Sequence, residues 1–172
     1  MNEVTDIEGV LRGLELAIRT TDLHRFMRQV RWIWPALESL HFIGMALLIG
    51  TIGMFDLRLL GFARRVPVAA LHRLIPFGIA GFLLNATTGV MFIFGYPDQY
   101  IFNSAFRVKV LFIVLAGLNV LFFYSRVFRR LEHHPPGEPP PLAMRLAGGV
   151  SLCAWIGVMT AGRLLTFFRP PF

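Results

Sequence analysis

Four apolar stretches recur along the 172-residue chain, at about 35-55, 74-94, 106-124 and 142-161. Each has roughly the twenty residues that a helix needs to cross the hydrocarbon core of a bilayer. With 55% hydrophobic and 16% charged residues, the composition excludes an ordinary soluble domain. We therefore predict an all-α membrane protein, a single integral membrane domain over 1-172, built as an antiparallel four-helix transmembrane bundle.

The segment before the first span, residues 7-31, is predicted to form two amphipathic helices. Apolar residues recur at helical spacing from Ile7 to Ile18, and a second apolar stripe follows the cap-like residues 20-22. Trp32 and the tryptophan two positions later are typical of a membrane interface. We expect interfacial helices that anchor on the membrane surface, with a lid or docking surface as the alternative.

Arginines are concentrated in the connections after the first and third spans and are absent from the loop at 95-100. By the positive-inside rule, the two arginine-rich connections are cytoplasmic and both chain termini lie outside. The net charge of +7 is thereby explained as a topology signal. Because the arginines flank apolar runs, we expect the lipid bilayer as the partner and no nucleic acid.

Several polar residues interrupt the spans. An ionisable side chain in hydrocarbon costs about 2.5 kcal/mol or more, so it normally faces the bundle interior and pairs with another group. Glu38 and His41 are three positions apart and share a helix face. In the predicted orientation, residues from four separate spans gather in the outer leaflet. They are Glu38, His41, Thr88, Lys109 and Arg163.

A histidine and a lysine on facing helices of a bundle can ligate a haem iron, and nearby arginines and threonines can hold its propionates. We therefore predict one haem b near the outer leaflet, with His41 as an axial ligand and Lys109 as the second ligand. Arg107 or Arg163 would lie near the propionates, together with Thr88. No arrangement for nucleophilic catalysis is visible, so no catalytic residue is predicted.

Glu38 is predicted to support His41 by orienting the imidazole and accepting the proton that accompanies reduction. The function predicted from this cluster is a membrane-embedded redox protein or electron-transfer subunit. It would pass electrons between the haem and a quinone or another membrane protein subunit.

Two other functions are open at this stage. The polar residues could form only a structural network in a haem-free accessory subunit of a larger membrane complex. Alternatively, His41 and Met45, with Met91 and Met159 on other spans, suit Cu(I) in a copper permease. The adjacent histidines at 133-134, in a proline-rich linker, are a weaker metal candidate.

A set of motifs carries a family resemblance: Trp34-Pro-x-x-Glu38-x-x-His41-x-x-Gly44, Asp56-Leu-Arg58-Leu-Leu-Gly61, Thr88-Gly89, Phe106-x-x-Lys109 and Gly162-Arg163. They cover nearly the whole chain, which resembles a widespread family of uncharacterised bacterial four-span integral membrane proteins. This resemblance implies a location in the bacterial inner membrane.

The chain is more distantly similar to the membrane protoporphyrinogen oxidase and to the copper-resistance membrane proteins grouped with it. The similarity rests on Leu40-His41, Gly44, Gly50 and Arg58, and on Phe106 with Lys109. That oxidase binds haem b and requires its span-one histidine and span-three lysine, so the resemblance implies that His41 and Lys109 flank a haem. The chain departs from the oxidase in its N-terminal segment, in Glu38, Asp56 and Arg163, and in Phe106, which replaces a tryptophan.

Overall fold

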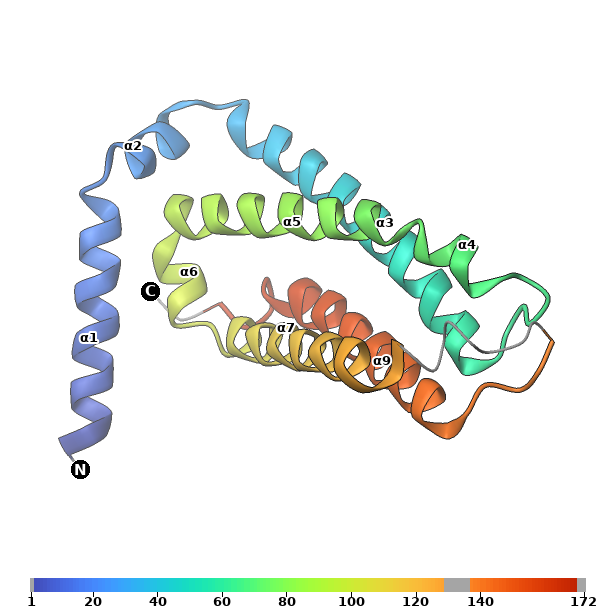
Figure 1. The fold of residues 1–172 in the computed structure, drawn as a ribbon. Helices are drawn as coiled ribbons and strands as arrows, with labels where there is room; N and C mark the ends of the chain where they lie inside the picture. The colour runs from blue at the N-terminus through green and yellow to red at the C-terminus, as the bar shows by residue number, and fades with distance from the viewer. Residues whose placement is uncertain (1, 129–136, 170–172) are drawn as a thin grey trace.

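The computed structural model describes residues 2-128 and 137-169, and this part of the chain is helical without strands. Its elements are α1 (Asn2–Arg19), α2 (Asp22–Gln29), α3 (Ile33–Leu60), α4 (Val68–His72), α5 (Ile75–Gly95), α6 (Pro97–Ile101), α7 (Ser104–Phe122), the π-helical turn η1 (Phe123–Val127) and α9 (Leu142–Leu164). Four of them, α3, α5, α7 continued by η1, and α9, are long and apolar enough to cross a membrane. The predicted antiparallel four-helix architecture is confirmed (Figure 1).

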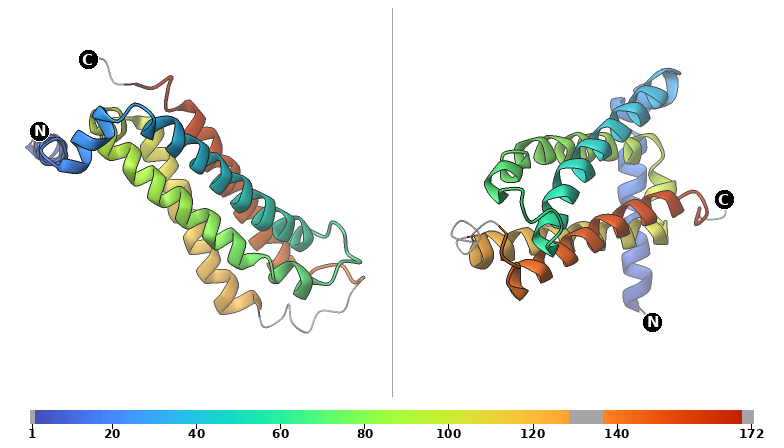
Figure 2. Two further views of the ribbon diagram at one scale, coloured as in Figure 1. Left: turned by 90° about the horizontal axis from the view of Figure 1, so that it is seen from above. Right: turned by 90° about the vertical axis from the view of Figure 1, so that its right-hand side faces the viewer.

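The four long helices pack in the order α5, α3, α9, α7, with each helix against the next. In the described part of the chain, α5 and α7 make at most a marginal contact, so the bundle has one open side between them (Figures 1 and 2). We call the two ends of the bundle the α6 end and the α4 end. The α6 end holds the start of α3 and the end of α5, and the α4 end holds the end of α3 and the start of α5.

Small residues determine how closely the helices approach, as is usual in lipid, where apolar burial gives no driving force between helices. A Cβ atom added to Gly81 of α5 would lie 2.7 Å from the Gly44 carbonyl oxygen of α3. A Cβ added to Gly148 of α9 would lie 2.8 Å from the Asp56 carbonyl oxygen. Glycine at these positions therefore permits α3 to contact both neighbours along its length.

The first span continues past the predicted boundary at 55 and includes Asp56 and Arg58, both of which are buried. The Arg58 side chain donates to two loop carbonyls, from Nε to Val66 at 2.9 Å and from Nη2 to Arg64 at 3.2 Å. Gly61 then ends the helix in the left-handed region at φ 102°. The folded loop thus supplies hydrogen-bond acceptors for the buried guanidinium group of Arg58.

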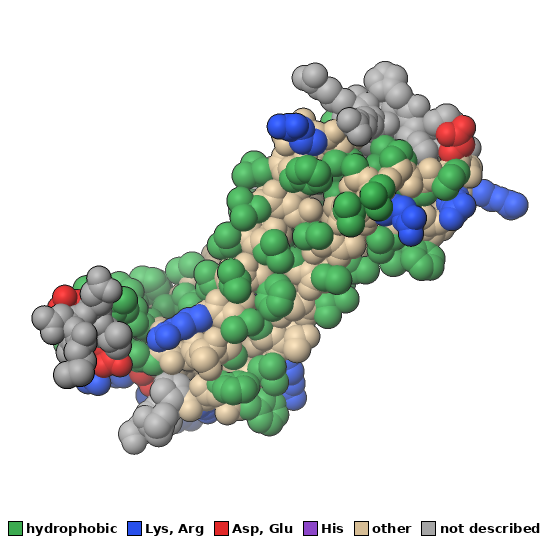
Figure 3. Space-filling model, turned by 90° about the horizontal axis from the view of Figure 1, so that it is seen from below, with side chains coloured by type: hydrophobic (Ala, Val, Ile, Leu, Met, Phe, Trp, Pro, Cys, Tyr) green, Lys and Arg blue, Asp and Glu red, His purple; other side chains and the backbone are tan. Residues whose placement is uncertain are grey.

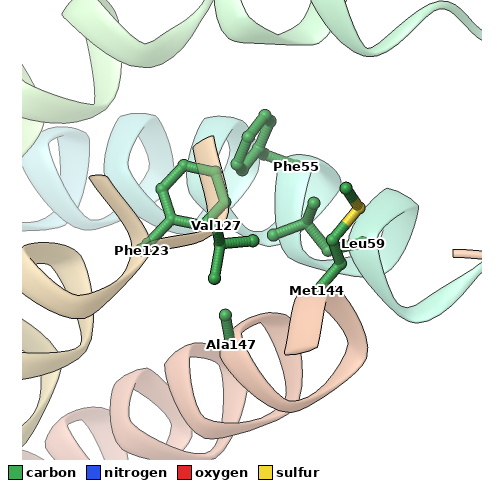
Figure 4. Close-up of a cluster of buried hydrophobic side chains, with 6 residues drawn as sticks. All are labelled: Phe55, Leu59, Phe123, Val127, Met144 and Ala147. Atoms are coloured by element: carbon green, nitrogen blue, oxygen red, sulfur yellow. The ribbon is translucent and has the colours of Figure 1, made fainter. Parts of the chain in front are cut away.

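A cluster of buried side chains closes the α4 end (Figure 4). It comprises Phe55, Leu59, Phe123, Val127, Met144 and Ala147. The members come from α3, η1 and α9, so three of the four spans meet there. On one face of the molecule, hydrophobic side chains cover the length of the bundle, and charged ones gather toward its two ends (Figure 3).

The N-terminal segment forms α1 and α2, joined where Thr21 caps α2 by accepting a hydrogen bond from the His24 amide at 3.1 Å. Helix α1 runs across the bundle direction at the α6 end (Figure 1). It is tied there by an ion pair of 3.4 Å between Arg19 and Asp98 of α6. Its location at a membrane interface stays a prediction, and the histidines at 133-134 lie outside the described residues.

Candidate functional site

His41 lies on α3 near the α6 end, half-buried against α5. Its Nδ1 atom is 2.7 Å from the Thr88 hydroxyl oxygen, and its ring centroid is 5.4 Å from that of Phe92. Thr88 is only 1% exposed. The predicted site residues His41 and Thr88 therefore contact each other, although 47 positions separate them in the chain.

The surroundings of Thr88 determine which nitrogen of His41 carries the proton. Its hydroxyl oxygen also lies 2.8 Å from the Leu84 carbonyl and 3.2 Å from the Asn85 carbonyl, both on its own helix. A threonine hydroxyl has one proton, and here it is directed to a backbone carbonyl. His41 must then donate from Nδ1, which leaves the lone pair on Nε2 for an external group.

Lys109 of α7 is half-buried, and its side chain lies over Gly162 of α9, where an added Cβ would be 3.5 Å from Nζ. Its charge interacts with His41 on α3. Among residues 2-128 and 137-169, no acidic side chain forms an ion pair with it. The structure thus brings His41 and Thr88 into contact, and it places Lys109 near enough for its charge to act on His41.

Glu38 lies elsewhere. It is exposed, and its Oε1 accepts a hydrogen bond of 3.0 Å from Trp34 Nε1 on the same helix. Within the described residues no hydrogen bond joins Glu38 to His41, so the group that orients the imidazole is Thr88. Arg107 and Arg163 are also exposed, at the start of α7 and the end of α9.

Glu38 does act on Tyr100 of α6, outside the spans. Burial, reinforced by the negative charge of Glu38 and opposed by Arg169, raises the pKa of Tyr100 to about 12. The phenol therefore remains neutral at physiological pH. It packs edge to face on Phe106 with ring centroids 5.6 Å apart, which ties α6 to the start of α7.

Asp56 forms a second polar site that the sequence analysis did not assign. It is 3% exposed, and in the described part of the chain its Oδ2 atom has no hydrogen-bond partner. Ser151 of α9 is the polar side chain that interacts with the carboxyl group. The available signal was an acid close to the end of an apolar run, which we interpreted only as the end of the span.

The side chains at the α6 end include nitrogen atoms of the kinds that ligate a haem iron. A haem iron needs only one or two protein ligands, and His41 Nε2 and the Lys109 amine both lack a competing partner within the described residues. The described residues contain no group of three or more His, Cys, Asp or Glu that could hold a metal ion. This finding does not test the copper site with methionine ligands.

No family model, curated protein or solved structure matches this chain. The resemblance to a four-span bacterial family therefore stays a prediction. The function must be argued from the residues of the site.

Proposed function

We propose that the protein is a membrane-embedded redox protein that binds one haem b at the α6 end of the bundle, with His41 Nε2 as an axial ligand. The observation that supports this most is the 2.7 Å hydrogen bond between His41 Nδ1 and Thr88, which leaves Nε2 available. A neighbour on the second ring nitrogen is the usual feature of a metal-binding histidine. Bound haem supplies one-electron chemistry.

Lys109 is the proposed second ligand. It lies on α7, its charge acts on His41, and no acidic side chain among the described residues holds it in an ion pair. The amine is therefore free to bind iron or to pair with a propionate. The open side between α5 and α7 supplies the entry for a flat ligand, because these helices do not pack closely on each other.

Arg107 and Arg163 are the proposed partners of the propionates. Both side chains are exposed at the α6 end, on α7 and α9 respectively. Long cationic side chains near helix ends place their charge at the membrane interface while their stems stay in the apolar layer. A guanidinium group there forms strong hydrogen bonds to carboxylates.

The cellular setting belongs to the same proposal. Arginine-rich connections follow the first and third spans, which supports cytoplasmic loops at the α4 end and both termini outside. The protein would then reside in the bacterial inner membrane, with the haem near the outer leaflet. Its electrons would be exchanged with a quinone or with another membrane subunit.

The test is a reduced-minus-oxidised absorption spectrum of purified protein from cells supplied with ample haem. Wild type should show a b-type spectrum, which His41→Ala abolishes and Lys109→Ala shifts. His72→Ala is the matched control, since His72 is a half-buried histidine at the α4 end, 3.3 Å from the Tyr124 hydroxyl. A colourless wild-type protein, or equal loss in His72→Ala, contradicts the proposal.

A haem-free accessory subunit is the second candidate, and one observation favours it. Helix α1 exposes apolar side chains beyond the bundle, including Ile7, Val10 and Leu14. Such a stripe suits docking to a neighbouring subunit or to lipid. A colourless protein whose loss, or whose truncation before Thr21, disassembles a membrane complex would support this second function.

A further inference from the structure

We infer a second ligand site at the α4 end, beside Asp56, that takes a single aromatic ring bearing a hydroxyl group, such as the head ring of a quinol or a small phenol. The site is a cavity of about 130 Å³ among the four spanning helices. It does not depend on haem binding at the α6 end. It lies where the bundle is open to lipid.

The size of the cavity selects a single ring. An apolar cavity of about 150 Å³ in a well-studied protein binds benzene, so a cavity of about 130 Å³ suits one six-membered ring rather than a fused system. Aromatic rings line it: Phe55 and Phe123 meet edge to face with centroids 5.6 Å apart. Ile52, Ile75 and Ile79 complete apolar walls from α3 and α5.

The polar groups on the wall select a hydroxyl. Asp56 Oδ2 is buried and has no hydrogen-bond partner within residues 2-128 and 137-169, and leaving such a group without a donor is unfavourable. Asn119, also on the wall, uses its Nδ2 to donate to the Ala147 carbonyl at 3.0 Å and retains its amide oxygen as an acceptor. A ligand with a ring hydroxyl supplies the missing donor, whereas an acyl chain or an apolar ring does not.

The open side of the bundle gives the ligand its route. Ile79 of α5 lines the cavity and is 53% exposed, so it stands at the opening toward lipid. Tyr124 lines the cavity from η1, and its hydroxyl lies 3.3 Å from His72 Nε2. An apolar molecule with one polar end can therefore enter from the membrane between α5 and η1.

Binding is measured by ¹⁹F NMR on the full-length protein in lipid nanodiscs, with 4-fluorophenol and fluorobenzene as nearly isosteric probes. We expect 4-fluorophenol to bind at least about tenfold more tightly after correction for partition into empty nanodiscs. Asp56→Leu should remove this preference while retaining a folded protein by size-exclusion chromatography. Equal binding of the two probes to wild type, or an unchanged preference in Asp56→Leu, overturns the inference.

A pair of variants on α5 tests the position of the site without changing its polar groups. Ile79→Trp should fill the opening and weaken 4-fluorophenol binding about tenfold or more, because an enlarged side chain takes the volume of the ring. Leu83→Trp is the matched control, since Leu83 is 58% exposed on the same helix and does not line the cavity. An equal effect of the two variants places the probe elsewhere and overturns the assignment.

Competition experiments identify which class of molecule supplies the ring that the cavity binds. Displacement of 4-fluorophenol by a decyl-chain benzoquinol, but not by decane, identifies a lipid-soluble quinol. Displacement by 4-methylphenol alone identifies a small phenol. Displacement by decane shows that the cavity takes acyl chains, and this result overturns the inference.

Discussion

His41 and Asp56 lie on the same helix, fifteen positions or about 22 Å apart, and their surroundings differ in one decisive respect. His41 has a hydrogen-bond partner on the nitrogen that faces α5, so it is held in one orientation with its other nitrogen available. Asp56 is more deeply buried and has a carboxylate oxygen with no partner in the described part of the chain. The first side chain is held by its hydrogen bond, and the second has an oxygen that lacks a donor among the described residues.

The two ends of the bundle also differ in packing. At the α6 end, Thr88 of α5 contacts His41 where α3 packs on α5, and the charge of Lys109 on α7 acts on the same histidine. At the α4 end, Asp56 lines a cavity together with Phe55, Leu59, Phe123 and Ala147, which belong to the apolar cluster of Figure 4. Burial alone therefore does not distinguish two kinds of polar group in a span. The hydrogen bonds of each group must also be known, because they separate a side chain held by a partner, such as His41, from one with an oxygen that lacks a donor among the described residues, such as Asp56.

The largest effect is expected from the partner of His41. Thr88→Val should weaken haem binding about 10- to 100-fold, because removing an outer partner frees the imidazole to rotate. Haem titration of the purified apoprotein measures this change. Thr88→Ser, which keeps the hydroxyl, should bind within a few-fold of wild type. Asp56→Leu, at the α4 end, should leave haem binding unchanged. A loss of haem affinity in Asp56→Leu as large as that in Thr88→Val would contradict the assignment of the haem to the α6 end.

A smaller effect, on stability, is expected from a substitution where α3 packs on α9 near Asp56. Gly148→Ala should lower the free energy of unfolding by about 1–3 kcal/mol, because the added methyl group overlaps backbone and forces the helices apart. Gly149→Ala is the control, since its Cβ would lie 3.6 Å from Leu60, an ordinary contact. Denaturation in mixed SDS micelles measures both. Equal stability of the two variants would contradict the close approach of α3 and α9.

The two polar groups should respond in opposite ways to an apolar replacement. Asp56→Leu should change the free energy of unfolding by no more than about 1 kcal/mol, or raise it, because a buried carboxyl group whose Oδ2 atom has no partner among the described residues is replaced by a group that needs none. Thr88→Val leaves the His41 donor without its acceptor and should be the less stable variant. Thermal unfolding monitored by circular dichroism compares them. The reverse order of stability would show that Asp56 Oδ2 does receive a hydrogen bond in the folded protein.

The smallest effect concerns Tyr100 at the α6 end. Its pKa is raised to about 12 in the folded protein, so the unfolded chain releases the phenolic proton at lower pH than the folded one. Wild type should lose stability relative to Tyr100→Phe as the pH rises from about 10 to 12, and the difference between them should be constant below about pH 9. A pH series of thermal unfolding measures this difference. A change near neutral pH would contradict the assignment.

The sequence by itself determined the architecture in broad outline. Four apolar stretches of sufficient length predict four spanning helices, and the structure contains them, at Ile33–Leu60, Ala70–Gly95, Ser104–Val127 and Leu142–Leu164. Local chemistry also predicted the cap of α2, where Thr21 accepts from the third residue after it. These features depend on neighbouring residues and on helix length, which the chain shows directly.

The sequence also allowed part of the candidate site to be predicted. The depth of residues in antiparallel spans placed His41, Thr88 and Lys109 at one level, and the structure brings them together. The same argument grouped Glu38 with them, but its partner is Trp34 at the surface of the helix. Depth in a span is a single coordinate, so it does not determine the direction of a side chain.

Only the tertiary structure decided which faces of the helices are inside. In lipid, apolar residues serve equally well against acyl chains and against other helices, so hydrophobic periodicity does not indicate the interior of a bundle. The close approaches at Gly81 and Gly148 orient α3, and that orientation buries Asp56 and leaves α5 apart from α7. The cavity beside Asp56 follows from that packing of separate helices, so no single span of the sequence indicates it.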